Sequence, residues 1–139
     1  MKKEKINVKW TDGMSFEANV DGYKVQIDSD PEFGGQGKGP KPKPLMMVAL
    51  AGCTGMDMVS LMNKMRVEYE SLNIVVEGDL TEDHPKHFKK MKVIYEISGS
   101  NVDLKKVEKI VSMSKEKYCG VSYSYKQALE IEYEIKIID

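Results

Sequence analysis

Apolar and polar residues alternate along the first 28 residues of the chain. The apolar positions recur at every second residue in three short runs, at about 6–10, 14–20 and 23–27. Successive side chains of a strand point to opposite faces of its sheet, so this period predicts half-buried strands. An Asp-Gly pair separates each run from the next, which is typical of a hairpin turn. The pattern therefore predicts a three-stranded antiparallel meander over about residues 5–28.

Residues 45–65 follow a different pattern, with apolar side chains on almost every face of a proline-free helix. At about 1.5 Å per residue this helix would be about 30 Å long, enough to cross a small domain or a membrane. Asp57, Asn63 and Lys64 interrupt the run, which favours a central core helix. A helix that is apolar on all sides needs cover on all sides. We expect an intertwined homodimer to supply the second half of that cover.

The remainder of the chain predicts three more strands and a second helix. The predicted elements are strands over 74–78, 88–97 and 129–137, and an amphipathic helix from 104 to about 117. Asn101 or Asp103 is placed to cap this helix, and residues 121–127 favour neither helix nor strand. The element order predicts an α+β fold, with antiparallel strands packed around a long central helix in a single domain over residues 1–139.

Composition narrows the class of protein. A hydrophobic fraction of 41% and a charged fraction of 31% are typical of a soluble globular domain. The net charge of -1, without a basic block, argues against a nucleic-acid partner. The N-terminal segment has no apolar signal-peptide core, so we expect a cytoplasmic protein without a membrane partner. In that reducing compartment, the two cysteines are expected to be free, catalytic or redox-cycling.

Cys53 lies in the middle of the predicted core helix, between Gly52 and Gly55. The two glycines leave room for another backbone or a small substrate near the sulfur. Burial opposes formation of the thiolate, and Asp57, one turn further on, is expected to raise the pKa of Cys53 unless a cation neutralises it. The residues alone also allow an inert cysteine that packs as a small hydrophobe. Cys119 is too distant in sequence to form a local metal motif with Cys53.

Two other patterns have simpler interpretations. Gly37-Lys38-Gly39 suggests a phosphate loop, but no Ser or Thr follows the lysine and the glycine spacing is wrong. The Gly- and Pro-rich stretch over 28–43 therefore predicts a mobile crossover loop. His84 and His87 are spaced to ligate zinc, but no further Cys or His stands nearby, which favours a solvated turn.

Two motifs carry a family resemblance. The segment G-P-K-P-K-P-L-M-M-V-A-L-A-G-C-T-G-M-D-M-V-S, residues 39–60, resembles the central-helix motif of the OsmC/Ohr family. The segment S-K-E-K-Y-C-G-V-S, residues 114–122, resembles that family's second cysteine motif. The order of strands and helices is similar as well, so the resemblance covers nearly the whole chain. The chain looks like the branch with A-G-C-T-G-M-D and E-K-Y-C motifs, whose activity is largely uncharacterised.

This resemblance implies an OsmC-like fold, an intertwined homodimer, and sites at the dimer interface. It also implies an oxidative-stress protein that reduces organic hydroperoxides as a peroxiredoxin-like thiol peroxidase. Cys53 would be the peroxidatic thiolate, which attacks the hydroperoxide and becomes a sulfenic acid. Cys119 would be the resolving thiol, and an external dithiol would reduce the resulting disulfide. The implied mechanism requires no metal and no organic cofactor.

The sequence departs from the family pattern at the groups that activate the thiolate. Family members use an Arg from the N-terminal region and a Glu shortly before the helical cysteine. Here residues 1–65 contain no arginine, and Arg66 follows the helix. Lys41 and Lys43 stand where the Glu is expected, and either is a candidate to lower the pKa of Cys53 as a point charge. Two alternatives stay open: a dimer that binds a small apolar ligand without catalysis, and a dithiol redox sensor.

Overall fold

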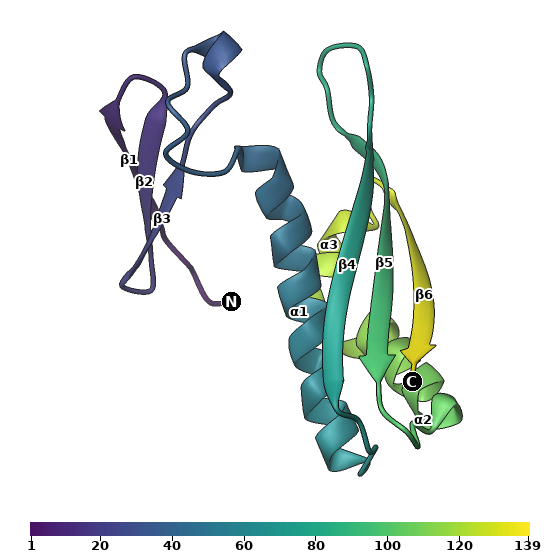
Figure 1. Ribbon diagram of the computed structural model, residues 1–139. Helices are drawn as coiled ribbons and strands as arrows, with labels where there is room; N and C mark the ends of the chain where they lie inside the picture. The colour runs from purple at the N-terminus through teal and green to yellow at the C-terminus, as the bar shows by residue number, and fades with distance from the viewer. The chain divides into compact units, whose positions relative to one another are not determined.

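The computed structural model describes all residues, 1–139, as two compact units, residues 1–46 (unit 1) and 47–139 (unit 2). In chain order (Figure 1) the elements are β1 (Asn7–Asp12), β2 (Ser15–Val20), β3 (Tyr23–Ile27), a 3-10 turn (Pro31–Phe33), α1 (Pro42–Lys64), β4 (Ser71–Leu80), β5 (Phe88–Ser98), α2 (Leu104–Met113), a π-helical turn (Ser114–Tyr118), α3 (Gly120–Tyr125) and β6 (Glu130–Ile138). The strands form two sheets, ordered β1-β2-β3 and β4-β5-β6. This arrangement confirms the α+β class and the long central helix.

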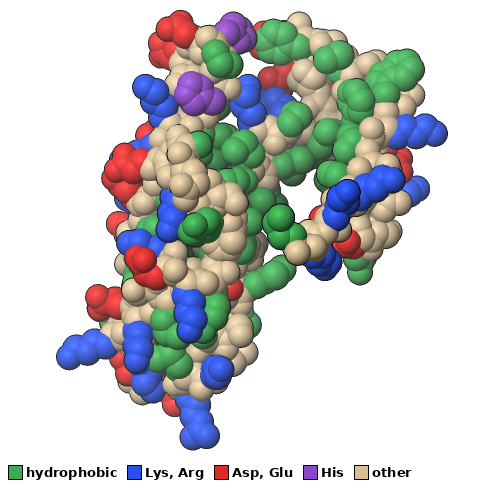
Figure 2. Space-filling model, turned by 180° about the vertical axis from the view of Figure 1, so that it is seen from behind, with side chains coloured by type: hydrophobic (Ala, Val, Ile, Leu, Met, Phe, Trp, Pro, Cys, Tyr) green, Lys and Arg blue, Asp and Glu red, His purple; other side chains and the backbone are tan.

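Unit 1 contains the predicted antiparallel meander. Asp21 and Gly22 connect β2 to β3 and both have positive φ, as a tight hairpin turn requires. The strands were predicted to be half-buried, but β1 is exposed along its whole length, including Val8 and Trp10. Unit 1 contains no second layer that would cover the strand. Figure 2 shows hydrophobic side chains at the surface of this unit (right in that view).

The loop after β3 is organised around one buried carboxylate. Asp28 accepts hydrogen bonds from the Ser15 hydroxyl at 2.9 Å and from the backbone N–H groups of Ser29 at 2.7 Å, Gln36 at 3.1 Å and Lys38 at 3.0 Å. These bonds, the one from Lys38 most of all, lower the pKa of Asp28 to about 2. The amides of the glycine-rich segment thus bind an anion from the same chain. The phosphate-loop pattern is explained by this internal contact.

Helix α1 agrees closely with the predicted core helix. Five of its side chains are buried: Leu50, Thr54, Met58, Leu61 and Met62. The opposite face is apolar but uncovered, with Val48 63% exposed, Met56 76% exposed and Val59 41% exposed. By length and composition α1 would also cross a membrane, but a core helix passes the same test. Arg66 follows the helix in the left-handed region, with φ of 57°.

In unit 2 the helices pack against one face of the β4-β5-β6 sheet. The residues of β5 that face this core are Met91, Val93, Tyr95 and Ile97. The other face is polar and carries ion pairs between β5 and β6, from Lys90 to Glu132 at 2.8 Å and from Lys92 to Glu134 at 3.4 Å. Figure 2 shows basic and acidic side chains interspersed over the surface of unit 2 (left in that view).

Strand β6 runs parallel to β5, whereas the sequence analysis expected antiparallel strands throughout. Two parallel strands need a long crossover connection, and the segment from α2 to α3 provides it.

The helices of this crossover differ in detail from the prediction. Asp103, one of the two residues predicted to cap α2, does so by accepting a hydrogen bond from the Lys106 N–H at 3.2 Å. The helical segment continues to Tyr118, in agreement with the predicted end at about residue 117, but its last part, from Ser114, is π-helical. The ambiguous residues after Cys119 form α3.

Candidate redox site at Cys53 and Cys119

The structure brings the two cysteines together in unit 2. Cys53 lies near the middle of α1, and Cys119 is the N-cap residue of α3. Both are free thiols, and their side chains are in hydrogen-bonding contact. Two residues 66 positions apart in the chain therefore form one pair, as a disulfide-forming couple must. No group of three or more His, Cys, Asp or Glu side chains is arranged to hold a metal ion.

The surroundings of Cys53 favour its neutral form. Burial raises the pKa of the Cys53 thiol, and so do the hydrogen bond to Cys119 and the negative charges at Cys119 and Asp57. The backbone N–H of Val121 acts in the opposite direction, because it donates to the sulfur. The effect expected of Asp57 is present, since its partner is the Ser114 hydroxyl at 2.7 Å rather than a cation. Cys53 is thus a thiol, not a thiolate, near neutral pH.

Cys119 is held by backbone contacts and is only 3% exposed. Its sulfur accepts a hydrogen bond from the Ser122 N–H at 3.3 Å, and its carbonyl accepts from the Ser122 hydroxyl and the Tyr123 N–H, both at 3.1 Å. Its own N–H donates to the Ser114 carbonyl at 2.8 Å. Cys53, which is only partly buried, is therefore the sulfur that a small reagent reaches more easily.

Asp57 and Ser114 link the two cysteine-bearing segments. Asp57 is one turn beyond Cys53 on α1, and Ser114 begins the π-helical turn that leads to Cys119. The Ser114 side chain donates to Asp57 while its carbonyl accepts from Cys119. The two bonds connect the positions of the thiols. Asp57 is recognisable in the sequence as a polar group in the helix, but its partner Ser114, 57 residues away, is not.

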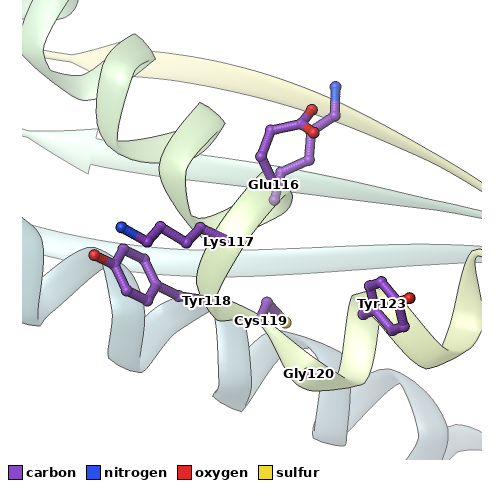
Figure 3. Close-up of a pocket in the computed structure, with 7 residues that line it drawn as sticks. Glu116, Lys117, Tyr118, Cys119, Gly120 and Tyr123 are labelled. Atoms are coloured by element: carbon purple, nitrogen blue, oxygen red, sulfur yellow. The ribbon is translucent and has the colours of Figure 1, made fainter.

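A small pocket of about 160 Å³ opens beside Cys119 (Figure 3). Its lining consists of Lys115, Glu116, Lys117, Tyr118, Cys119, Gly120 and Tyr123. In Figure 3 Lys117 and Tyr118 lie on one side of Cys119 and Tyr123 lies on the other. The Lys117 ammonium is 5.4 Å from the centre of the Tyr118 ring. The pocket places two lysines, one glutamate and two tyrosines around Cys119, and its volume admits a small reagent.

Tyr95 is a further polar group near the pair that the sequence analysis did not identify. Its hydroxyl is buried and has no hydrogen-bond partner. Burial, with the negative charges at Tyr133 and Cys119, raises the pKa of the Tyr95 phenol far above its usual value. The available signal was its position, because the alternation of β5 places a tyrosine in an otherwise aliphatic and methionine-containing stripe.

The basic residues considered in the sequence analysis are placed elsewhere or are already paired. Arg66 lies thirteen residues beyond Cys53, about 20 Å along a helix, so it cannot contact Cys53 of the same chain. Lys41 pairs with Asp30 at 3.3 Å inside unit 1, and Lys43 is exposed in the first turn of α1.

His84 and His87 both lie in the exposed turn between β4 and β5. This position agrees with the solvated turn that the sequence analysis favoured over a zinc site.

These features define an α+β protein with a paired thiol site, in which a core helix and the N-cap of a short helix each supply one cysteine. The model of the OsmC-like protein family matches residues 35–134. The chain belongs to this family, which confirms the resemblance seen in its two motifs.

Similar proteins extend over nearly the full chain. Protein YhfA of Escherichia coli K12 is 26% identical over 133 residues, covering 94% of this chain and 96% of its own. A hypothetical protein from Aquifex aeolicus VF5 has a similar structure, with a TM-score of 0.86 at 24% identity, covering 99% and 98% of the two chains. An organic hydroperoxide resistance protein OsmC from Legionella pneumophila has a TM-score of 0.68 at 19% identity, covering 98% and 99%. The two structural likenesses establish a shared fold.

Proposed function

We propose that this chain is a two-cysteine thiol reductase that acts on organic hydroperoxides. Membership of the OsmC-like family suggests a peroxide-related stress protein. The similar Legionella protein is described as an organic hydroperoxide resistance protein and a predicted redox protein. The observation that carries the proposal is the contact between the Cys53 and Cys119 thiols, because a two-cysteine cycle requires the two sulfurs to be adjacent.

The cycle has three balanced steps. The Cys53 thiolate attacks the distal oxygen of the hydroperoxide, so that an S–O bond forms, the O–O bond breaks and the alcohol leaves after taking up a proton. The Cys119 thiol then attacks the sulfenic sulfur, which forms the disulfide and releases water. An external dithiol reduces this disulfide by thiol–disulfide exchange and becomes a disulfide itself. The net reaction converts hydroperoxide and dithiol into alcohol, water and a new disulfide.

The surroundings of Cys53 set an expected pH dependence. The pKa of Cys53 is raised above its reference value of 9.0, and the thiolate is the reactive species. The rate of the first step therefore increases with pH through the neutral range and continues to increase beyond about pH 9. A cation near the site would shift this profile to lower pH. Lys43, whose side chain is exposed, remains a candidate for that role, whereas Lys41 is paired with Asp30.

Peroxide turnover with matched variants tests the proposal. The wild type should consume cumene hydroperoxide in the presence of dithiothreitol, and Cys53→Ser should not. Without dithiothreitol, Cys119→Ser should react once and stop at a sulfenic acid, which dimedone traps as an adduct visible by mass spectrometry. Equal turnover by the wild type and Cys53→Ser would refute the proposal.

A dithiol redox sensor is the second candidate, and the raised pKa of Cys53 supports it. A thiol that is mostly protonated reacts slowly, which suits a sensor better than a rapidly cycling enzyme. In that case one equivalent of peroxide would produce the disulfide, but turnover with excess dithiol would stay close to the uncatalysed rate.

The proposed functional unit is a homodimer. The uncovered face of α1 supports this assembly, because Val48, Met56 and Val59 form an exposed apolar stripe on a helix that is otherwise part of the core. Association of two such faces would remove this stripe from water. A small apolar ligand in an interface cavity is the alternative occupant, and native mass spectrometry would detect it as added mass on the purified protein.

A further inference from the structure

The hydroxyl of Tyr95 is unusual for a core residue. Tyr95 lies in the central strand β5, is 0% exposed and has no hydrogen-bond partner. An unpaired buried hydroxyl destabilises a fold, and a phenylalanine would fill nearly the same space without that penalty. Most buried polar groups have partners, so an exception asks for an explanation.

A second tyrosine, Tyr133, packs against Tyr95 and provides a comparison. The ring of Tyr133 stacks on that of Tyr95, with centroids 6.4 Å apart and planes 13° apart. Tyr133 is only half-buried, and its phenol lies close to the Ser122 side chain. Of these two stacked tyrosines, only Tyr95 has a fully buried hydroxyl without a hydrogen-bond partner.

The groups near Tyr95 are Cys119 and residues that lie next to Cys53 on α1. Tyr95 and Cys119 belong to the same buried core cluster, and Cys53 packs against that cluster. Negative charge at Cys119 or at Asp57 raises the pKa of the Tyr95 phenol. Thr54, next to Cys53 in the chain, is also close, but its hydroxyl proton is committed to the Leu50 carbonyl at 2.9 Å. Tyr95 therefore presents an unused donor to a site where a negative charge has to develop on sulfur.

That charge develops when the disulfide is reduced. An external thiolate attacks the more accessible Cys53 sulfur, a new S–S bond forms, and the electron pair of the broken bond moves to Cys119. Cys119 is almost fully buried, and its sulfur has the Ser122 N–H as a donor at 3.3 Å. A buried anion needs more than one such donor to be stabilised well.

We propose that the Tyr95 hydroxyl donates a hydrogen bond to the Cys119 sulfur while that sulfur carries negative charge. The bond is absent in the dithiol state, in which the hydroxyl is unpaired. A donor of this kind lowers the barrier between the dithiol and the disulfide without stabilising either end state. The inference rests on the disulfide of the proposed function, but it does not depend on a peroxide substrate.

The test compares Tyr95→Phe with Tyr133→Phe, which removes a hydroxyl from the stacked ring. Each protein is oxidised with diamide, which takes up the two hydrogen atoms of the thiols, and the disulfide is verified by mass. Its reduction by dithiothreitol and its re-formation by oxidised dithiothreitol are then followed on the protein itself, by quenching with acid, alkylating the protein thiols and measuring the added mass. We expect Tyr95→Phe to slow both directions by the same factor, about tenfold or more. Tyr133→Phe should stay near the wild-type rates.

Two further measurements separate this role from a structural one. The equilibrium constant with dithiothreitol should be unchanged in Tyr95→Phe, because the bond exists in neither end state. Its resistance to urea should be equal to that of the wild type or higher, because an unpaired hydroxyl has been removed.

Three results would overturn the inference: wild-type rates in Tyr95→Phe, slower rates accompanied by a changed equilibrium constant or lower stability, or failure of diamide to link Cys53 to Cys119. The proposed function is tested separately. A wild type that does not turn over peroxide, but whose disulfide exchange depends on Tyr95, would refute only the peroxidase.

Discussion

Replacing Ser114 with alanine tests the link between the two cysteine-bearing segments. The Ser114 hydroxyl donates to the Asp57 carboxylate over 2.7 Å, and Ser114 is fully buried. A hydrogen bond to a charged group contributes about 1.5–3 kcal/mol to stability. Asp57 is only partly buried, so water can solvate the carboxylate when its partner is lost. We therefore expect the free energy of unfolding to fall by about 1.5–2 kcal/mol, near the lower end of that range.

A double-mutant cycle isolates this contribution. Urea unfolding of Ser114→Ala, Asp57→Ala and the double variant gives a coupling energy, which we expect to be about 1.5 kcal/mol. The backbone bond from Cys119 to the Ser114 carbonyl does not involve the side chain, so all three variants can retain it. Disulfide formation by diamide should also be slower in Ser114→Ala, because α1 and the π-helical turn are less firmly connected. A coupling energy below about 0.5 kcal/mol would refute the reasoning, since additive behaviour indicates independent sites.

Three further predictions concern other parts of the molecule. The pKa of Asp28 is lowered from 3.8 to about 2, so its stabilising effect is complete above about pH 4 and is lost as the pH falls towards 2; the fluorescence of Trp10 should report this loss in the wild type and not in Asp28→Asn. Met56→Asp should weaken the proposed homodimer about a thousandfold in sedimentation equilibrium, because each of two symmetry-related copies loses about 2 kcal/mol of apolar burial; an unchanged dimer would exclude this face. Asp57→Asn should lower the pKa of Cys53 and increase its rate of alkylation by iodoacetamide at neutral pH, whereas an equal or lower rate would show that the charge does not act on the thiol.

Much of the fold follows from local patterns that tertiary contacts do not override. Strict alternation and Asp-Gly turns were enough to predict β1 to β3, and the cap at Asp103 marks the start of α2. The parallel pairing of β6 with β5 was not predictable in this way. Alternation shows which residues of a strand face the core, but it does not show whether the neighbouring strand runs parallel or antiparallel. The same limit applies to Asp28, whose partners become visible only when the loop closes around it.

The site was predictable in its cysteines but not in its supporting groups. Cys53 and Cys119 were singled out through family motifs, and the structure brings them into contact. Ser114 and Tyr95 carry no motif, and each acquires its importance from a partner distant in the chain. The alternation of β5 indicates that Tyr95 is buried, but the absence of a partner for its hydroxyl is a property of packing that no sequence pattern identifies.

The state of Cys53 and the open face of α1 lead to the same requirement. Within unit 2, burial, Cys119 and Asp57 all raise the pKa of Cys53, and the Val121 N–H opposes them. A fast peroxidatic thiol needs a nearby cation, and Arg66, the only arginine of the chain, is too distant along its own helix. The uncovered α1 face also needs a partner surface. The proposed second copy would meet both needs, because it would cover the apolar stripe and bring another set of basic side chains to the helix that carries Cys53. An alkylation rate of Cys53 that increases on dimer formation would support this account, and a rate independent of protein concentration across the dissociation range would contradict it.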